Sequence, residues 1–96
     1  MIRSFADEAA EHLYHGISSK RALRIPVSLW PAARRRLDML NAAVELRDLA
    51  APPGNRLEKL GGSLAGCYSI RINDQFRVVF RWRGDGAYEV QITDYH

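Results

Sequence analysis

The sequence predicts a single α+β domain in which helices pack on one face of an antiparallel sheet. Two observations support this fold class. Apolar residues in the first half of the chain recur three or four positions apart, the spacing of a helix, whereas in the second half they alternate with polar residues at the period of two typical of strands. A chain of 96 residues has room for one such core, so we interpret residues 1–96 as one domain.

A short strand over residues 1–5 is expected to begin the chain, followed by a helix over about residues 6–15. Ser4 is the expected N-cap of this helix, because its hydroxyl could accept a hydrogen bond from the first turn. Gly16 is expected to end it. The apolar residues that would form its buried stripe recur four apart: Phe5, Ala9 and Leu13.

Pro31 is well placed to open a second helix, since its missing N–H is no loss in a first turn. The apolar residues that follow have helical spacing: Ala33, Leu37, Leu40 and Val44. We expect a loop or a short helical turn over residues 16–30. Residues 44–49 either continue the second helix or form a third, and the run from Pro52 to Gly54 ends helical structure.

Alternation predicts three strands, over residues 67–72, 76–82 and 87–93, which form a meander. Residues 55–59 could add a further strand. In the favoured register Trp82 lies opposite Tyr88, because a slip of one residue would expose apolar side chains to water. The positions expected to face the helices are Tyr68, Ile70, Ile72, Phe76, Val78, Phe80, Trp82, Tyr88, Val90 and Ile92.

The same register predicts which polar side chains share the outer face of the sheet. Arg71 is expected opposite Arg77, and Arg81 opposite Glu89. Glu89 can balance Arg81, whereas the other two arginines have no cross-strand acid and would repel each other. Such a pair suits an external anion such as phosphate, which guanidinium groups bind in bidentate fashion. A merely solvated pair is the alternative.

The net charge of +3 is modest but unevenly placed. A concentrated basic segment favours an anionic partner, either a nucleic acid or an acidic stretch of protein, and a solvated basic face is the alternative. Between His12 and Leu37 the chain carries six basic residues and no acid: Lys20, Arg21, Arg24, Arg34, Arg35 and Arg36.

Several classes of protein are disfavoured. The apolar runs are far shorter than the roughly 20 residues of a membrane-spanning helix, and the charges of Arg3, Asp7 and Glu8 interrupt the position of a secretory leader. One cysteine, Cys67, excludes an internal disulfide framework and a cysteine-rich zinc site, and we expect it to be structural. We therefore expect a cytoplasmic protein with no cofactor, no metal and no membrane partner.

Three residues, Asp94, Tyr95 and His96, end the sequence with groups that phosphodiester cleavage uses. Strand parity puts Tyr95 on the same face as Arg77. Histidine exchanges protons near neutral pH, tyrosine can stack on a base, and arginine can stabilise a phosphorane. A terminus with no chemical role is the alternative.

Three motifs, in order, carry a resemblance to a known family. They are PPGNRLEKL at residues 52–60, GCYSIRINDQFRV at residues 66–78, and the final DYH. Together they closely resemble HigB-type toxins, which belong to the RelE/ParE superfamily of bacterial toxin–antitoxin systems. The similarity is dense from about residue 44 to the end, includes residues 1–5, and is weak between residues 16 and 30.

The resemblance implies a RelE-like fold and a ribosome-dependent, metal-independent endonuclease that cleaves messenger RNA in the A site. The 2′-hydroxyl of the substrate would attack the adjacent phosphate and leave a 2′,3′-cyclic or 3′-phosphate end. The implied partners are the ribosome, its mRNA and a helix-turn-helix antitoxin of the HigA type. Two alternatives remain on the same fold: a ParE-like inhibitor of DNA gyrase without nuclease activity, and a degenerate toxin that only binds its antitoxin.

The family's site residues can be carried over by position. Arg77 matches the arginine after the turn of the second motif and would stabilise the phosphorane. Tyr95 and His96 match the terminal catalytic pair, and Asp94 would orient them or share their acid–base work. Arg71 would hold the scissile phosphate or its neighbour.

Glu58 lies where some members of the family have a catalytic histidine, so it could serve as a second proton carrier, unless Tyr95 and His96 do both jobs. Residues 61–66 depart from the family because they lack the charged residues common in that loop, which would weaken ribosome contact. The basic segment could bind ribosomal RNA or be covered by the antitoxin. The other expected RNA-binding residues are Arg56, Lys59, Lys20, Arg21 and Arg34.

Overall fold

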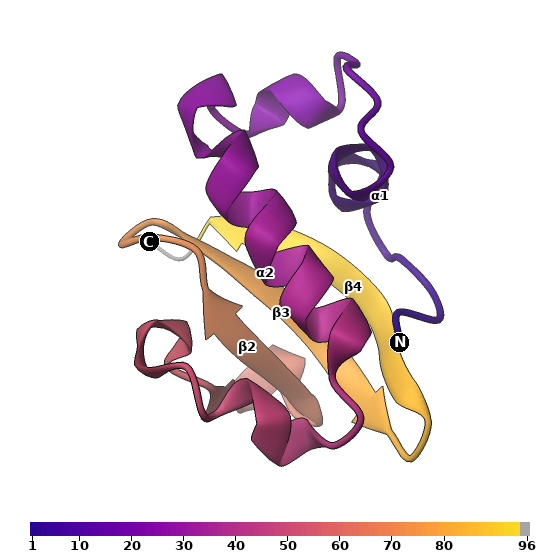
Figure 1. Cartoon of the computed structure of the whole chain (residues 1–96), viewed down its shortest axis with the longest axis vertical. Helices are drawn as coiled ribbons and strands as arrows, with labels where there is room; N and C mark the ends of the chain where they lie inside the picture. The colour runs from indigo at the N-terminus through magenta and orange to yellow at the C-terminus, as the bar shows by residue number, and fades with distance from the viewer. Residues whose placement is uncertain (95–96) are drawn as a thin grey trace.

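A four-stranded antiparallel sheet in the order β1-β2-β3-β4 forms one layer of the protein, and the helices cover one of its faces (Figure 1). The computed structural model describes residues 1–94. The predicted α+β fold is therefore confirmed, including the additional strand before the meander. The strands are β1 (Glu58–Lys59), β2 (Cys67–Arg71), β3 (Phe76–Arg83) and β4 (Gly86–Asp94).

The first residues run beside β4 and form two isolated parallel bridges with it. Ile2 pairs with Ala87 and Phe5 pairs with Val90. The backbone N–H of Arg3 donates to the carbonyl of Ala87 at 2.7 Å. The predicted N-terminal strand is thus reduced to two bridges, but it does join the sheet.

The first helix, α1 (Glu8–Tyr14), is capped by Asp7 and not by Ser4. The carboxylate of Asp7 accepts a hydrogen bond from the N–H of Ala10 at 3.2 Å. The hydroxyl of Ser4 instead accepts from the N–H of Glu89 in β4 at 2.9 Å. The predicted cap was wrong because the backbone up to residue 6 is still bonded to β4, so the helix begins later.

Gly16 follows α1 in the left-handed backbone conformation, with φ of +72°, which a glycine adopts without a steric penalty. Its N–H donates to the carbonyl of Leu13, and the next N–H, of Ile17, donates to His12, the arrangement of a Schellman motif. The predicted loop after it holds two short 3₁₀ turns: η1 (Ala22–Arg24) and η2 (Val27–Leu29).

The second helix, α2 (Trp30–Ala42), has Pro31 in its first turn, as predicted. The helix lies over β3 and β4 (Figure 1), and its buried residues follow the predicted stripe. They are Trp30, Ala33, Leu37 and Leu40.

Val44 was wrongly included in that stripe, since it lies beyond the end of α2 and is 78% exposed. The backbone becomes extended at Ala43, and a separate 3₁₀ turn, η3 (Leu46–Leu49), follows. The carboxylate of Asp48 accepts hydrogen bonds from the N–H groups of Val44 and Glu45, which hold its pKa below the usual value. A new helix start, with its own capping box, therefore replaces a continuation of α2.

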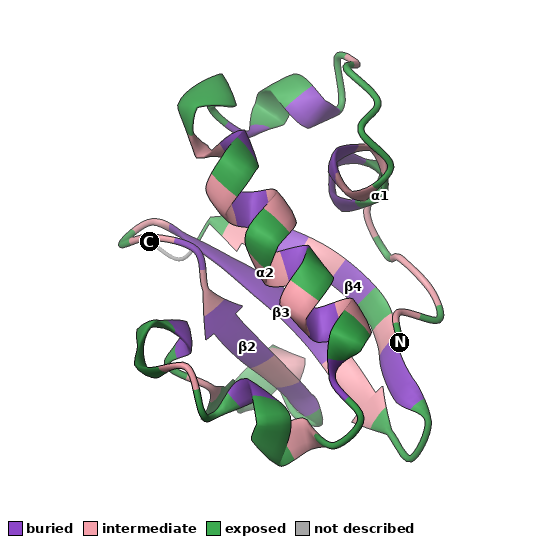
Figure 2. Cartoon of the chain, viewed as in Figure 1, coloured by how far each residue is buried: buried purple, intermediate pink, exposed green. Residues whose placement is uncertain are grey.

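The main core lies between the helices and the inner face of the sheet, where purple segments of α1, α2 and the strands meet (Figure 2). Burial at this scale contributes roughly 1.5–3 kcal/mol for each large apolar side chain. The largest fully buried residues of this cluster are Phe80, Leu13, Ile25, Leu37, Leu40, Leu49, Ile70, Ile92, Val78 and Val90.

The outer face of the sheet is partly apolar, which the alternating pattern did not predict. Cys67 and Val79 are buried there beneath Leu60, with Leu64 packed beside them. Leu64 belongs to a 3₁₀ turn, η5 (Gly62–Leu64), in the connection between β1 and β2. This connection closes part of the outer face, and the remainder of that face carries the polar residues described below.

Strand β4 contains a bulge. Two of its residues, Glu89 and Val90, lie opposite the single residue Phe80 of β3, because the register changes between Val79 and Arg81. Glu89 has φ of +52°, an uncommon left-handed conformation for a residue other than glycine. A bulge adds one residue to one strand only. The residues of β4 on its two sides therefore do not follow one continuous alternation between the two faces of the sheet.

The predicted partners in the second hairpin were therefore wrong by one residue. Arg81 lies opposite Tyr88, and Trp82 lies opposite Ala87. Ala87 is fully buried and takes the inward position that was wrongly expected for Tyr88, which lies opposite Arg81 on the outer face. The predicted ion pair survives the shift, since Arg81 Nε lies 3.0 Å from the carboxylate of Glu89.

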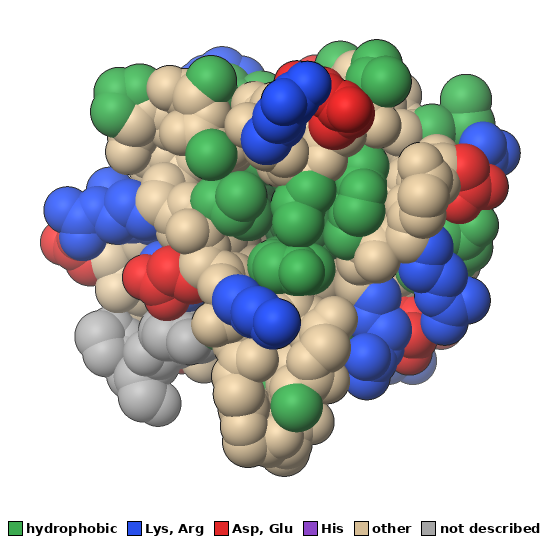
Figure 3. Space-filling model, turned by 90° about the horizontal axis from the view of Figure 1, so that it is seen from below, with side chains coloured by type: hydrophobic (Ala, Val, Ile, Leu, Met, Phe, Trp, Pro, Cys, Tyr) green, Lys and Arg blue, Asp and Glu red, His purple; other side chains and the backbone are tan. Residues whose placement is uncertain are grey.

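The end of the molecule seen from below carries a group of hydrophobic side chains with Lys and Arg side chains around it (Figure 3).

Among residues 1–94, no helix is both long enough and apolar enough to pass through a lipid bilayer.

We predict that D7A lowers the free energy of unfolding by about 2–3 kcal/mol. Asp7 caps α1, accepts from the N–H of Ile92 and pairs with Arg24, so its removal leaves two elements without a shared partner. Urea unfolding measures the change. E8A removes an exposed acid one residue away and should cost less than about 0.5 kcal/mol; equal effects of the two variants would contradict this role for Asp7.

We also predict that G86A is strongly destabilising. Gly86 has φ of +155°, and a Cβ at this position would lie 2.1 Å from the carbonyl oxygen of Met1. The N-terminal segment would have to leave β4, and we expect a loss of about 2 kcal/mol or more in urea unfolding. G84A is the matched control, because a Cβ at Gly84 has no neighbour within 4 Å; a comparable loss in both variants would refute the proposed clash.

Candidate functional site

The sheet brings three of the predicted site residues to one end, where β2 turns into β3 and β4 terminates. Arg71 lies opposite Arg77 as predicted, and Arg77 lies opposite Thr93. Asp94, the last residue of β4, lies opposite Phe76. Hairpin register thus places two guanidinium groups together on the outer face at this end of the sheet. The carboxylate of Asp94 lies at the same end, at a position that faces the same side as Phe76.

Tyr95 and His96 follow Asp94 directly in the sequence and lie outside the described residues. Their predicted catalytic roles therefore stay predictions. The side chain of Asp94 accepts a hydrogen bond from the amide of Gln75 at 2.9 Å, which ties the end of β4 to the turn between β2 and β3.

Arg77 is the most deeply buried charged residue of this group, with 7% of its surface exposed. Its Nε donates to the hydroxyl of Ser69 at 2.7 Å, and its Nη2 donates to the carbonyl of Arg56 at 2.6 Å. A buried guanidinium needs such partners, since an uncompensated buried charge costs several kcal/mol. These bonds hold the guanidinium in one orientation on the outer face of the sheet.

Glu58 supplies an acid beside this guanidinium. Glu58 is paired with Ser69 across β1 and β2, and its carboxylate lies 3.8 Å from Nη1 of Arg77. Arg77 has no acid among its direct cross-strand partners, as expected, because these are Arg71 and Thr93. The acid comes from β1, one strand beyond the neighbour that the hairpin register identifies, and its side chain is half exposed.

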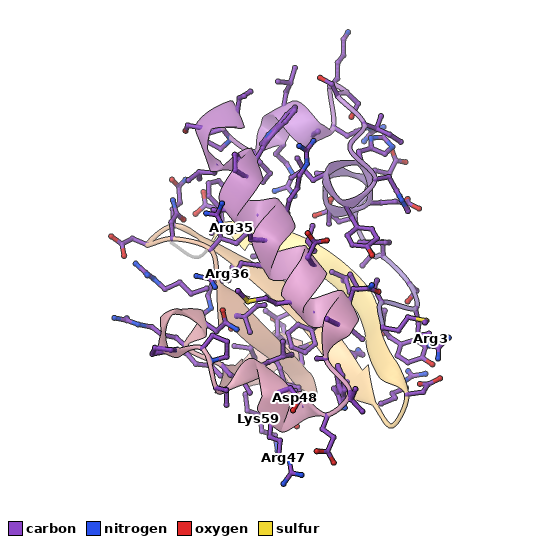
Figure 4. All side chains as sticks on the ribbon, in the orientation of Figure 1. Arg3, Arg35, Arg36, Arg47, Asp48 and Lys59 are labelled. Atoms are coloured by element: carbon purple, nitrogen blue, oxygen red, sulfur yellow. The ribbon has the colours of Figure 1, made fainter. Side chains whose placement is uncertain are left out.

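Arg56 contributes through its backbone. Its φ of +44° is left-handed, and its carbonyl is the one that accepts from Arg77. Its own side chain is exposed, so it remains a candidate for RNA binding. Lys59 lies at the bottom of the view in Figure 4, near Arg47 and away from Arg36. Lys59 pairs with Tyr68, whereas its neighbour Glu58 pairs with Ser69, so Lys59 faces the opposite side of the sheet from Glu58.

Arg71 has no cross-strand acid, as expected, but it is ion-paired with Asp74 in the β2–β3 turn. The side chain of Asp74 is 94% exposed. An exposed pair of this kind contributes about 0–1 kcal/mol and exchanges easily with other anions. Arg71 is thus accessible to a phosphate at low cost.

Arg36 on α2 is an arginine of this region that sequence reasoning placed only within the basic segment. Its burial, together with the nearby charges of Arg35 and Arg71, lowers its pKa from the usual value. Its position next to Arg71 depends on how α2 crosses the sheet, and no local pattern encodes that crossing. The helical spacing does predict that Leu37 is buried, so Arg36, one residue before it, is expected at the edge of the helix–sheet interface.

The rest of the basic segment serves other parts of the fold. Arg34 donates from Nε to the carbonyl of Leu13 at 3.0 Å and lies 5.8 Å over the ring of Trp30, so it braces α2 against α1. Lys20 and Arg21 line a pocket of about 540 Å³ beside α1, which also contains acidic residues. The predicted RNA-binding role of these three residues stays a prediction.

Within residues 1–94, no three His, Cys, Asp or Glu side chains come close enough together to hold a metal ion. The chemical groups that this part of the chain does bring together are guanidinium groups, carboxylates and hydroxyl groups. Such a set can bind an anion, stabilise added negative charge and exchange protons.

Comparison with known proteins agrees with this fold. A family model described as a RelE-like toxin of type II toxin–antitoxin system HigB matches residues 3–96. Toxin HigB-1 of Vibrio cholerae serotype O1 is 44% identical over 82 residues, which cover 85% of this chain and 84% of that protein. An uncharacterized protein of Haemophilus influenzae is 37% identical over 62 residues, 65% of this chain and 61% of its own.

The α+β architecture and the match over nearly the whole chain define a RelE-like toxin of a type II toxin–antitoxin system. Within that class, the chain belongs to the HigB-like toxin family. The family implies an antitoxin as a partner.

We predict that S69A destabilises the protein by about 1–3 kcal/mol, because it leaves the buried Nε of Arg77 without its hydroxyl acceptor. Urea unfolding measures the change. S63A is the control, since Ser63 is exposed in the β1–β2 connection and should change stability by less than about 0.5 kcal/mol. An S69A protein as stable as the parent would show that this hydrogen bond does not hold Arg77.

Proposed function

We propose that this toxin is a ribosome-dependent endonuclease that cleaves messenger RNA without a metal ion. The observation that carries the proposal is the fixed guanidinium of Arg77, which lies at the same end of the sheet as Arg71, Glu58 and Asp94. Membership of the HigB-like family supports the same conclusion, since RNA cleavage is typical of that family.

In the proposed reaction the 2′-hydroxyl of one nucleotide attacks the phosphate that follows it. A base takes the 2′ proton, a pentavalent phosphorane forms, and an acid protonates the 5′-oxygen as it leaves. The products are a 2′,3′-cyclic phosphate and a free 5′-hydroxyl, so no protein nucleophile is required. The protein must supply charge stabilisation and two proton transfers.

Arg77 is suited to stabilise the phosphorane because its orientation is set before substrate binds. Hydrogen bonds from Nε and Nη2 fix the plane of the group, so little reorganisation is needed when negative charge develops. Arg71, whose partner Asp74 is exposed, would hold the substrate phosphate.

Four side chains are candidates for the proton transfers. Glu58 lies 3.8 Å from Arg77 and is half exposed, so a substrate hydroxyl could reach it. Tyr95, His96 and Asp94 would supply the other transfer, with Asp94 held by Gln75 at the end of β4. In this assignment Glu58 performs the proton transfer that a histidine is expected to perform in some members of the family.

The ribosome and its mRNA are the proposed partners besides the antitoxin, and a cytoplasmic location follows from them. Lys20, Arg21, Arg56 and Lys59 are exposed basic residues that would contact RNA. The antitoxin is proposed to be a helix-turn-helix protein of the HigA type. Inhibition of DNA gyrase, as in ParE-like proteins of the same fold, is the alternative activity and is an outcome of the test below.

We predict that deletion of His96, and separately R77A, relieves the growth arrest caused by expression without an antitoxin. Loss of one preorganised electrostatic group lowers a rate by about 10²–10³-fold. Primer extension on messages isolated after induction should show new cuts within coding regions for the parent and none for either variant.

R47Q is the control, because the side chain of Arg47 is 82% exposed and belongs to η3, outside the sheet that carries Arg77. It should arrest growth as the parent does. Since R77A removes a buried side chain, its unfolding is measured in parallel, and the His96 deletion tests the site without that complication. Unchanged arrest in both variants would refute the site, whereas intact messages with stalled DNA replication would support gyrase inhibition.

A further inference from the structure

Arg36 on α2 is held in place by a buried side chain of the segment before β1. Its Nη1 donates to Oδ1 of Asn55 at 2.6 Å, and Nδ2 of Asn55 donates to the carbonyl of Leu49 at 3.1 Å. Asn55 is fully buried. A long, flexible arginine side chain is thus fixed at its charged end, which lowers the entropy lost when a ligand binds it.

The charge that this contact fixes lies among other positive charges. Arg35 and Arg71 both act electrostatically on Arg36, and Figure 4 shows Arg35 and Arg36 on the side of α2 that faces the end of β2. The carboxylate beside Arg71 is the exposed Asp74. Holding like charges together is unfavourable, and an anion placed between them would relieve the repulsion.

Arg71 connects this group to the candidate active site, because it lies opposite Arg77 on the neighbouring strand. Three guanidinium groups, of Arg36, Arg71 and Arg77, therefore run from the edge of α2 onto the outer part of the sheet. A row of cations fits a chain of evenly spaced anions better than one small ion. The backbone of single-stranded RNA has this character.

We propose that Arg36, together with Arg71, binds a backbone phosphate of the message next to the phosphate that is cleaved. Asn55 is a positioning residue for Arg36. This proposal rests on the proposed function, and it assigns the α2 edge to the substrate strand rather than to ribosomal RNA.

The test measures binding of the full-length protein to a short, fluorescently labelled 2′-O-methyl oligoribonucleotide, which lacks the attacking hydroxyl and is not cleaved. Affinity is measured between about 50 and 200 mM salt. R36Q should bind at least about threefold more weakly at the upper end of this range, and its plot of log affinity against log salt should be shallower by about 0.7, the value for one lost phosphate contact.

Two further variants separate this role from overall charge and from folding. R47Q removes one positive charge from another part of the surface and should keep the salt dependence of the parent. R36K keeps the charge and should keep most of the salt dependence, even if loss of the contact with Asn55 weakens binding. Urea unfolding of all variants confirms that the comparison is made between folded proteins.

A salt dependence of R36Q equal to that of the parent would overturn the proposal, and so would failure of the parent to bind the oligonucleotide at the lowest salt. Association with vacant ribosomes is measured in parallel. A defect of R36Q confined to that assay would assign Arg36 to ribosomal RNA and would also overturn it. Failure of the proposed function is separate, since it is decided by growth arrest in the R77A and His96-deletion variants.

Discussion

Burial of the Arg77 guanidinium is the constraint that organises the outer half of this protein. A charge with so little exposed surface must be surrounded by acceptors, and the fold supplies them from three separate places. Ser69 comes from the neighbouring strand, the carbonyl of Arg56 from a left-handed turn, and Glu58 from the short strand β1. The connection that contains Arg56 and Glu58 also carries Leu60 and Leu64 over the outer face. The same segment thus completes a small second core and fixes the group proposed to stabilise the transition state.

Apolar and polar residues have separate roles in this fold. Periodic apolar residues in α2 and in the strands form the main core, which holds the strands in register. The polar residues at that end then need little local structure of their own, because Arg71, Arg77 and Asp94 are positioned by strand register. Side-chain bonds refine the arrangement: Asn55 fixes Arg36, and Gln75 holds Asp94. A rigid scaffold with accessible charged groups at its edge is what binding of a flexible polyanion requires.

The α+β class, α2, the meander and the pairing of Arg71 with Arg77 could all be predicted from the sequence, since the spacing of apolar residues directly reports which face is buried. Other features could not, and three of them show why. Asp7 replaces Ser4 as the cap of α1 because Ser4 is engaged with β4, a contact between residues far apart in sequence. Tyr88, Val90 and Ile92 still alternate with polar residues in the sequence, so the pattern gives no sign of the bulge at Glu89. Glu58 reaches Arg77 across an intervening strand, and cross-strand rules identify immediate neighbours only.

The outer edge of β4 is already occupied, and this limits how the protein can associate. Ala87 and Val90 are bonded to the first residues of the chain, while the N–H and carbonyl of Ile92 are taken by the side chains of Asp7 and Arg24. The opposite edge, β1, consists of two residues. A sheet closed in this way offers no long row of unpaired backbone groups in the described part of the chain, so strand addition by a second copy or by an antitoxin is disfavoured. Within residues 1–94, the two edges of the sheet therefore leave few backbone groups to which another strand could pair.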